Sequence, residues 1–216
     1  MLEGVLFDFD GVVVQSERLH MRTFLELLSP YGVDVDEVRW YKEFAGTGSK
    51  HIFEVLLKEY DIREDADSLV EKRKKAYEDR VRAGELKETP GVRSFLGALR
   101  SKKTKIAIVS GSHRTNVRAA LETLHLGEFD IIISGDEMKE RKPDPMPYLQ
   151  AAKMLSIHPA GCVVIEDSVA GCEAARRALM KLIVMESPAL PYVGKYDLAI
   201  RDFIGLDYEN VARLFR

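Results

Sequence analysis

The chain is poor in cysteine, with two in 216 residues. Cys162 and Cys172 stand ten positions apart and lack the close CxxC spacing of zinc and redox sites. Two separate thiols of this kind are typical of a cytosolic protein that keeps its cysteines reduced and buried. The sequence therefore predicts buried free thiols and no cysteine-based metal site.

Long apolar runs and an excess of positive charge are also absent. No run approaches the roughly 20 apolar residues that span a bilayer. A strand-like run follows Met1 directly, without a charged n-region or a cleavage site. The net charge is -3, so nothing calls for a nucleic-acid partner. We expect a cytoplasmic protein with no membrane or nucleic-acid partner, and a monomer.

Short apolar runs recur along the chain, and they indicate the fold class. Each has few alternating polar residues, which is typical of strands buried on both faces of a parallel sheet. Helical spacing separates the later runs, over residues 91–101, 114–124, 146–155 and 169–179. This alternation predicts an α/β fold with a doubly wound, Rossmann-like parallel sheet. The predicted strands are Val5–Phe9, Ile106–Val109, Ile131–Ile133, Val163–Ile165, Leu182–Met185 and Leu198–Ile200.

Residues 16–87 follow another pattern, with helical spacing and no convincing strand. Loop signals at Ser29-Pro30, at Gly46–Gly48 and at Asp61–Asp65 separate three or four helices. A helical block between the first strand and the rest of a β/α chain indicates an insertion. The sequence predicts a core domain of residues 1–15 and 88–216, and an inserted α-helical cap domain of residues 16–87.

Polar residues follow four of the predicted strands. Ligands bind at the carboxyl ends of strands in open parallel sheets, so we expect these side chains to meet at one edge. Taken singly, each group has another interpretation: a turn, a helix cap or a solvated charge run. Their occurrence together favours a site. The residues are Asp8 and Asp10, then Ser110 and Gly111, then Lys142 in the loop 141–145, then Glu166 and Asp167.

This set of residue types suits phosphoryl transfer. Neighbouring carboxylates repel one another unless a cation lies among them, and oxygen ligands with open positions suit Mg²⁺. One aspartate can attack phosphorus, and a second one two residues along can transfer protons. A serine hydroxyl, backbone N–H groups and a lysine would hold the phosphoryl oxygens. The sequence predicts an enzyme that acts on a small-molecule phosphate ester.

The motifs resemble those of the haloacid dehalogenase superfamily. DFDGVV at residues 8–13, VSGS with Ser110, KPDP with Lys142 and VIEDSVAG with Glu166 are similar to its four motifs, in order. Over nearly the whole chain the sequence resembles the branch with a helical cap after the first strand. That branch includes phosphoglycolate phosphatases, sugar-phosphate phosphatases and β-phosphoglucomutase.

The resemblance implies a role for each residue. Asp8 would be the nucleophile and Asp10 the general acid/base. Mg²⁺ would be held by Asp8, the backbone carbonyl of Asp10 and Asp167, with Glu166 close behind. Ser110, Gly111 and Lys142 would bind the phosphoryl group. True dehalogenases lack the second aspartate, so Asp10 argues against carbon–halogen chemistry.

Within the predicted cap domain, three residues are further candidates for substrate binding. Gly46 and Lys50 lie in a glycine-rich turn that opens a predicted helix, and such a turn can bind phosphate. The same turn can equally be an ordinary helix boundary. His20 matches a histidine that many relatives carry, but it can also be a surface or partly buried histidine.

The chain departs from the family pattern at three positions. Gln15 stands where this branch usually has an aspartate, at the hinge. Ser49 stands where β-phosphoglucomutases carry an arginine for a second phosphate, and Arg114 stands where they carry an asparagine. We therefore expect a magnesium-dependent phosphatase with an aspartyl-phosphate intermediate. A β-phosphoglucomutase-like phosphomutase is the alternative.

Overall fold

The computed structural model describes residues 1–187 and 194–216. The chain divides into two compact units. We call Met1–Gln15 together with Lys87–Arg216 the core unit, and Ser16–Leu86 the helical unit. The sequence prediction places the second border one residue later, between residues 87 and 88.

The core unit contains a six-stranded parallel sheet, which confirms the predicted α/β class. The strands follow the order β3-β2-β1-β4-β5-β6, so β1 lies in the middle of the sheet. Their bounds are β1 Gly4–Phe7, β2 Lys105–Val109, β3 Ile131–Ile133, β4 Cys162–Glu166, β5 Lys181–Met185 and β6 Leu198–Ile200. All six predicted strands form. β1 ends at Phe7 instead of Phe9, because the Phe9 carbonyl accepts the N–H groups of Val13 and Val14 and closes a turn there.

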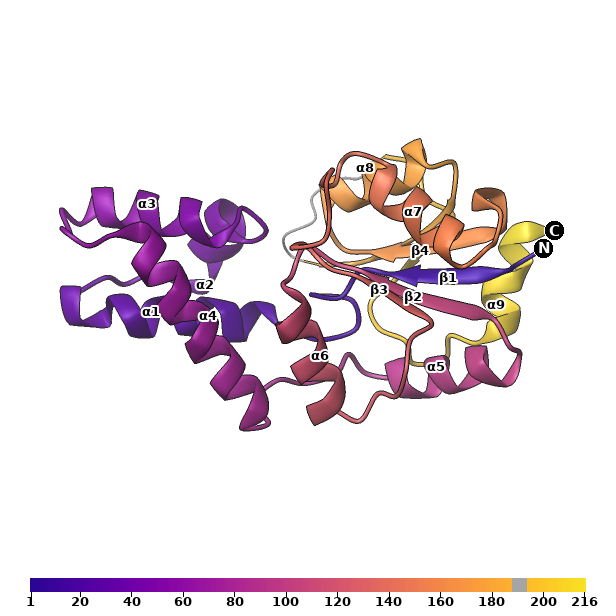
Figure 1. The fold of residues 1–216 in the computed structure, drawn as a ribbon, viewed down its shortest axis with the longest axis horizontal. Helices are drawn as coiled ribbons and strands as arrows, with labels where there is room; N and C mark the ends of the chain where they lie inside the picture. Colours follow the sequence, from indigo (N-terminus) through magenta and orange to yellow (C-terminus); the bar gives the residue numbers. More distant parts are fainter. Residues whose placement is uncertain (188–193) are drawn as a thin grey trace. The chain divides into compact units, whose positions relative to one another are not determined.

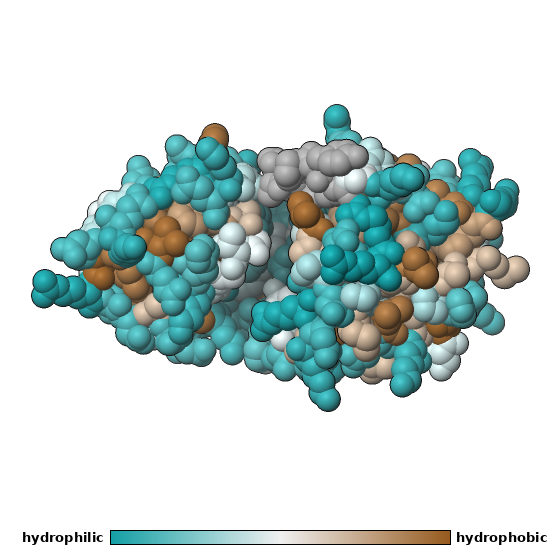
Figure 2. Space-filling view, turned by 90° about the horizontal axis from the view of Figure 1, so that it is seen from above, coloured by the Kyte–Doolittle hydropathy of each residue, from teal (hydrophilic) through white to brown (hydrophobic). Residues whose placement is uncertain are grey.

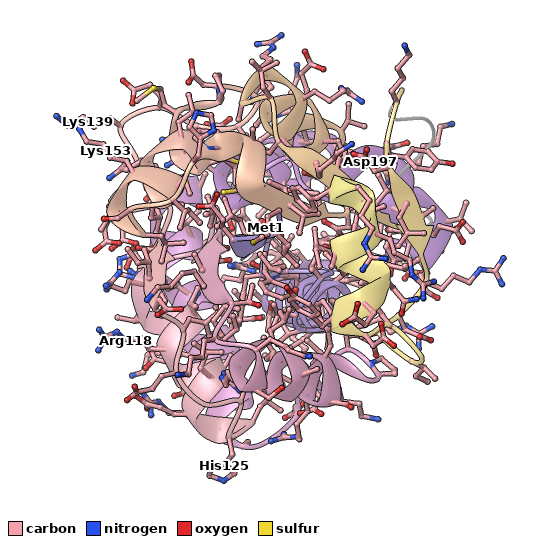
Figure 3. All side chains as sticks on the ribbon, turned by 90° about the vertical axis from the view of Figure 1, so that its right-hand side faces the viewer. Met1, Arg118, His125, Lys139, Lys153 and Asp197 are labelled. Carbon is pink, nitrogen blue, oxygen red and sulfur yellow. The ribbon has the colours of Figure 1, made fainter. Side chains whose placement is uncertain are left out.

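Helices cover both faces of the sheet. Figure 1 shows α7 (Met146–Met154) and α8 (Val169–Arg177) on one face, and α5 (Val92–Ser101), α6 (Arg114–Thr123) and α9 (Tyr208–Ala212) on the other. Figure 3 views the core unit from the edge where the strands begin, with Met1 near the middle. Short 3₁₀ helices lie at Pro159–Gly161 and Arg213–Phe215.

The alternation of side chains along β1 explains how both faces are filled. Phe7 makes edge contacts with Phe95 and Phe129 on one side of the sheet. Leu6 points to the opposite side. There it belongs to an apolar cluster with Tyr148 and with both cysteines. Cys162 and Cys172 are buried and free, as predicted, and burial raises the pKa of each thiol to about 12.

The helical unit forms no strand anywhere in Ser16–Leu86, as its pattern predicts. Its core contains Phe24, Trp40, Phe53 and Leu56. The Trp40 indole N–H donates to Glu17, so its buried polar atom is satisfied. The elements are α1 (Glu17–Leu28), a 3₁₀ turn (Ser29–Tyr31), α2 (Glu37–Arg39), a π turn (Trp40–Phe44), α3 (Ser49–Glu59) and α4 (Ala66–Arg82).

The face of the core unit on the side of α7 and α8 is mostly hydrophilic. Viewed from the side of α7 and α8, the core unit shows hydrophobic residues in small separate groups among hydrophilic ones (Figure 2). No helix in the described part of the chain is long and apolar enough to cross a membrane.

Candidate active site

The register of the sheet brings the ends of three strands together. Phe7 of β1 pairs with Ile108 of β2 on one side and with Ile165 of β4 on the other. The next residue, Asp8, therefore lies level with Val109 and Glu166. The apolar strands carry these polar side chains to the carboxyl edge of the sheet, where the sequence predicts a site.

Lys142 reaches this edge from the loop that precedes α7. Its ammonium Nζ donates to Asp8 Oδ1 at 2.5 Å, to Glu166 Oε1 at 2.6 Å and to the Val109 carbonyl at 2.8 Å. All three of its protons are therefore used. Burial alone would lower the pKa of Lys142, but the charges of Asp8 and Glu166 outweigh it and raise that pKa.

Glu166 is completely buried and saturated with hydrogen bonds. Oε1 accepts from Lys142 and, at 2.7 Å, from the Tyr148 hydroxyl. Oε2 accepts from the N–H groups of Asp167 and Ser168 and from the Ser168 hydroxyl. Burial opposes its ionisation, but the charge and hydrogen bond of Lys142 and the other donors lower the pKa of Glu166.

The backbone passes close to the carboxylates of Glu166 and Asp167 at two glycines, which have no side chain to occupy that space. A Cβ on Gly171, in α8, would lie 1.8 Å from Glu166 Oε1. A Cβ on Gly11 would lie 1.9 Å from Asp167 Oδ2, and Gly11 also has a φ of +77°. Both the space and the left-handed backbone therefore favour glycine at position 11.

Asp8, Glu166 and Asp167 together make an acidic cluster that could hold a metal ion. Each offers a carboxylate oxygen within 4.8 Å of the others. Burial, with the charge of Glu166, raises the pKa of Asp8 to about 7 in spite of Lys142. Burial and the charges of Asp8 and Glu166 also raise the pKa of Asp167. The repulsion among these oxygens fits a divalent cation with hard oxygen ligands.

Asp10 stands beside two serine hydroxyls. The Ser112 hydroxyl donates to Asp10 Oδ2 at 2.5 Å, while the Ser110 hydroxyl lies 3.5 Å from the same oxygen. The Ser112 N–H in turn donates to Ser110 Oγ at 3.0 Å. Ser112 was not among the predicted site residues. Its presence in the VSGS motif, two residues after Ser110, is the signal that could have found it.

The predicted residues of the helical unit do not form one group within it. The His20 ring stacks on Tyr77, and His20 Nδ1 lies 3.0 Å from an Arg73 guanidinium nitrogen. Lys50 instead pairs with Asp67, and both side chains are exposed. Nothing lies within 4 Å of a Cβ built on Gly46. The part of these residues in substrate binding stays a prediction.

Arg73 is a further residue that the sequence analysis missed. It is buried, and its guanidinium lies over the Phe24 ring at 4.8 Å. Residues 71–82 resemble a solvated charged face, but Leu69, Arg73 and Tyr77 recur at intervals of four and are all buried. That helical interval is the signal for Arg73.

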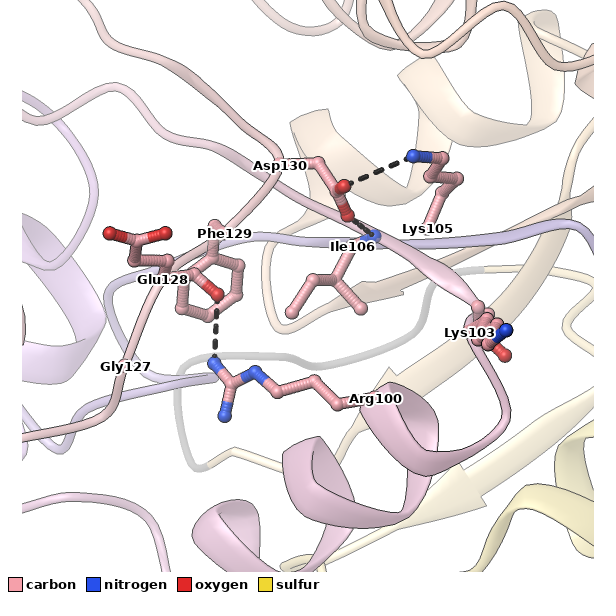
Figure 4. A pocket seen from close by; sticks show the side chains of 9 residues that line it. Arg100, Lys103, Lys105, Ile106, Gly127, Glu128, Phe129 and Asp130 are labelled. Carbon is pink, nitrogen blue, oxygen red and sulfur yellow. Dashed lines mark hydrogen bonds and ion pairs between the residues drawn. The ribbon is translucent and has the colours of Figure 1, made fainter.

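A pocket of about 610 Å³ lies at the opposite edge of the core sheet, where β2 begins. Figure 4 shows Arg100 donating to the Glu128 carbonyl, and Asp130 accepting from Lys105 and from the Ile106 N–H. Arg100 also donates to the Leu126 carbonyl. These charged groups are engaged in structural contacts, so the reactive groups remain those at the carboxyl edge.

Comparisons with known proteins identify the family of the chain. A family model described as "Haloacid dehalogenase-like hydrolase" matches residues 5–185. "Phosphorylated carbohydrates phosphatase" of Thermotoga maritima is 33% identical over 180 residues, which cover 82% of each chain. A solved structure of a "HAD hydrolase, family IA, variant 3" from Entamoeba histolytica is 26% identical, with a TM-score of 0.85 over 99% of each chain.

A second solved structure, of CbbY from Rhodobacter sphaeroides in complex with phosphate, is 25% identical. Its TM-score is 0.81 over 95% of this chain and 96% of that one. The matched family model spans the segment that contains all four motifs. The chain therefore belongs to the haloacid dehalogenase-like hydrolases, the family that the order of its motifs predicts.

Proposed function

We propose that this hydrolase is a magnesium-dependent phosphatase of phosphorylated sugars that works through an aspartyl-phosphate on Asp8. The observation that carries the proposal is the position of Asp8, which contacts Lys142 and belongs to the acidic cluster with Asp167. The similarity to a phosphorylated carbohydrates phosphatase supports sugar phosphates as the substrate class.

The acidic cluster is where Mg²⁺ would bind. Asp8, Asp167 and the backbone carbonyl of Asp10 would hold it. Both oxygens of Glu166 already accept hydrogen bonds, which supports a different role for it, as the anchor of Lys142. Bound Mg²⁺ would neutralise the carboxylates and the phosphoryl oxygens that they face.

The reaction would proceed in two steps. The Asp8 carboxylate forms a bond to phosphorus while the ester P–O bond breaks, and Asp10 gives its proton to the leaving oxygen. Water then attacks the aspartyl-phosphate, its proton passes to Asp10, and phosphate leaves Asp8. In both steps the Ser110 hydroxyl would hold a phosphoryl oxygen, and Lys142 would exchange one of its three present acceptors for another phosphoryl oxygen. The Ser112 hydroxyl keeps Asp10 in place.

Arg114 favours a phosphatase over the phosphomutase alternative. Its guanidinium donates to Glu137 at 2.7 Å and to the Ile132 carbonyl at 3.0 Å. At the position where mutases offer an asparagine, this side chain therefore binds the neighbouring loop. Ser49 supplies no guanidinium for a second phosphate either. The monomeric state and the cytoplasmic location stay predictions from the sequence.

The test is the release of inorganic phosphate from a panel of sugar phosphates and from p-nitrophenyl phosphate. We expect Mg²⁺-dependent turnover that is lost in EDTA and in Asp8→Asn. Asp79→Asn, the same substitution on the exposed face of α4, should keep wild-type turnover. Full turnover by Asp8→Asn would refute the proposal. Conversion of β-glucose 1-phosphate to glucose 6-phosphate without phosphate release would favour the mutase.

A further inference from the structure

We infer that the loop Ser134–Glu137 after β3 positions the loop Ser110–His113 for binding of the substrate phosphate, with Gly135 and Asp136 as positioning residues. The inference rests on the proposed function, because it assigns the second loop to phosphate binding. Both loops belong to the core unit and follow neighbouring strands, β3 and β2.

Gly135 brings the two backbones into direct contact. Its N–H donates to the Ser112 carbonyl at 2.9 Å. A Cβ on Gly135 would lie 2.0 Å from the Gly111 carbonyl oxygen and 2.7 Å from the carbonyl carbon. Real side chains essentially never approach backbone so closely, so any larger residue must displace the Gly111 peptide. The need for glycine here is one of space.

Asp136 holds the C-terminal end of the loop Ser110–His113, which we call the phosphate-binding loop. Its Oδ1 accepts from the Arg114 N–H at 2.9 Å, and Arg114 is the first residue of α6. Its Oδ2 lies 3.5 Å from His113 Nε2. A carboxylate at this place satisfies an N–H group that the helix itself cannot pair, and it lies at the positive end of the helix dipole.

Glu137 links the loop after β3 to Arg114, at the start of α6. Its Oε2 accepts from Arg114 at 2.7 Å and from the Ser134 hydroxyl at 2.8 Å. At the start of the loop, the Ser110 N–H donates to the Ile133 carbonyl at 2.9 Å. The phosphate-binding loop is therefore held at Ser110, Ser112 and Arg114.

Gly135 bonds the loop Ser110–His113 directly, and Asp136 bonds the Arg114 N–H that follows it. Their effect on the reaction must pass through the position of the Ser110 hydroxyl and the Gly111 peptide. Those groups would contact the phosphoryl group of the substrate and of the product phosphate alike. Loss of such uniform binding raises both the phosphate Kd and KM.

Gly135→Ala tests this, with Gly97→Ala as the matched control. Gly97 is exposed within α5, and nothing lies within 4 Å of a Cβ built there. The measurements are the Kd of inorganic phosphate by calorimetry in the presence of Mg²⁺, and kcat and KM for the best sugar phosphate. We expect the phosphate Kd and the KM to rise together about tenfold or more in Gly135→Ala. Gly97→Ala should match the wild type.

A second pair of variants decides the question if Gly135→Ala does not fold. Asp136→Ala removes the acceptor for the Arg114 N–H and should weaken phosphate binding about fivefold. Asp136→Asn keeps an oxygen acceptor and should restore most of the affinity. Wild-type phosphate affinity in folded Gly135→Ala, or in Asp136→Ala, would overturn the inference.

Phosphate binding is measured without turnover, so the two proposals fail separately. A wild-type protein that binds phosphate and hydrolyses no ester would refute the phosphatase, while the variants still decide the loop contact. An active wild type beside variants with unchanged phosphate affinity would refute the loop contact alone. A wild type that does not bind phosphate would overturn both.

Discussion

The Tyr148 hydroxyl donates a 2.7 Å hydrogen bond to Glu166 Oε1, the oxygen that also accepts from Lys142. Tyr148 is completely buried, and the Lys142 ammonium lies 5.0 Å from the centre of its ring. One tyrosine thus contacts both members of the buried ion pair that holds Asp8. The apolar helix α7 supplies this residue, so the packing of the core fixes the position of the lysine.

Tyr148→Phe should slow the reaction without removing the ring from the core. The substitution leaves Glu166 with one donor fewer, and a hydrogen bond to a buried charge contributes about 1.5–3 kcal/mol. We expect kcat to fall about threefold to tenfold with a smaller change in KM. The measurement is steady-state phosphate release, with Tm from calorimetry.

Tyr60→Phe is the control for the loss of a tyrosine hydroxyl. Tyr60 bonds the Asp34 backbone carbonyl within the helical unit. An equal loss of kcat in both variants would contradict a specific role for Tyr148.

The buried ion pair predicts a rescue of stability without a rescue of activity. Lys142→Met leaves Glu166 ionised and buried without its cation, which should cost about 3–5 kcal/mol of unfolding free energy. Adding Glu166→Gln removes the unpaired charge and should recover much of that loss. Both variants should lack turnover, because each lacks the lysine that holds Asp8.

Urea unfolding of the two variants and the wild type measures this difference. Activity in the double variant would show that Lys142 is not needed for the reaction.

The carboxyl edge of the sheet was predictable because its signals are local. Apolar runs mark the strands, and polar motifs follow four of them along the chain, so the strands and the position of the site could be inferred together. The partners of these motifs were not predictable in the same way. Tyr148, within α7, contacts Glu166 from a distance of 18 positions along the chain, and no motif marks that contact. Only packing decides which polar atoms meet over such separations.

Arg73 shows a second reason for a missed residue. Most arginines in a charged run are solvated, and its neighbours Lys72 and Lys75 are exposed. Arg73 is buried because it lies on the same face of α4 as Leu69 and Tyr77. The charged composition of the run indicates a solvated face, whereas the position of Arg73 on the helix determines its burial.

The acidic cluster predicts a pH dependence that Mg²⁺ reverses. Burial raises the pKa of Asp8 from 3.8 to about 7, so between these values the folded state binds more protons than the unfolded state. Without metal, the stability that Asp8 contributes in its protonated form is therefore lost as pH rises from about 4 to about 7. The raised pKa of Asp167 acts in the same direction.

In EDTA we expect Tm to fall by at least about 2–4 °C between pH 5 and pH 8 from this cause, which corresponds to about 1 kcal/mol. Mg²⁺ binds the ionised carboxylates, so its stabilising effect should be larger at pH 8 than at pH 5. Asp8→Asn removes one of the two titrating carboxyls and should make the EDTA profile less steep. A wild-type profile in EDTA that rises with pH over this range would contradict the prediction.

The contact between Ser112 and Asp10 predicts that a hydroxyl which does not itself bind the phosphoryl group affects the rate. Ser112 Oγ donates to Asp10 Oδ2, the carboxylate that would transfer protons in both steps. In Ser112→Ala this oxygen loses its donor at 2.5 Å, and the Ser110 hydroxyl, at 3.5 Å, is too distant to replace it with a strong bond. A freer carboxylate is less well placed for the leaving oxygen, and proton transfer contributes about 10²–10⁴-fold to catalysis. We therefore expect kcat to fall about tenfold for sugar phosphates. Substrates with a better leaving group, such as p-nitrophenyl phosphate, should be affected less, because they need less protonation.

Ser101→Ala, which removes an exposed hydroxyl at the end of α5, is the control and should leave both rates unchanged. An equal loss of kcat on both kinds of substrate in Ser112→Ala would instead assign Ser112 to binding of the phosphoryl group.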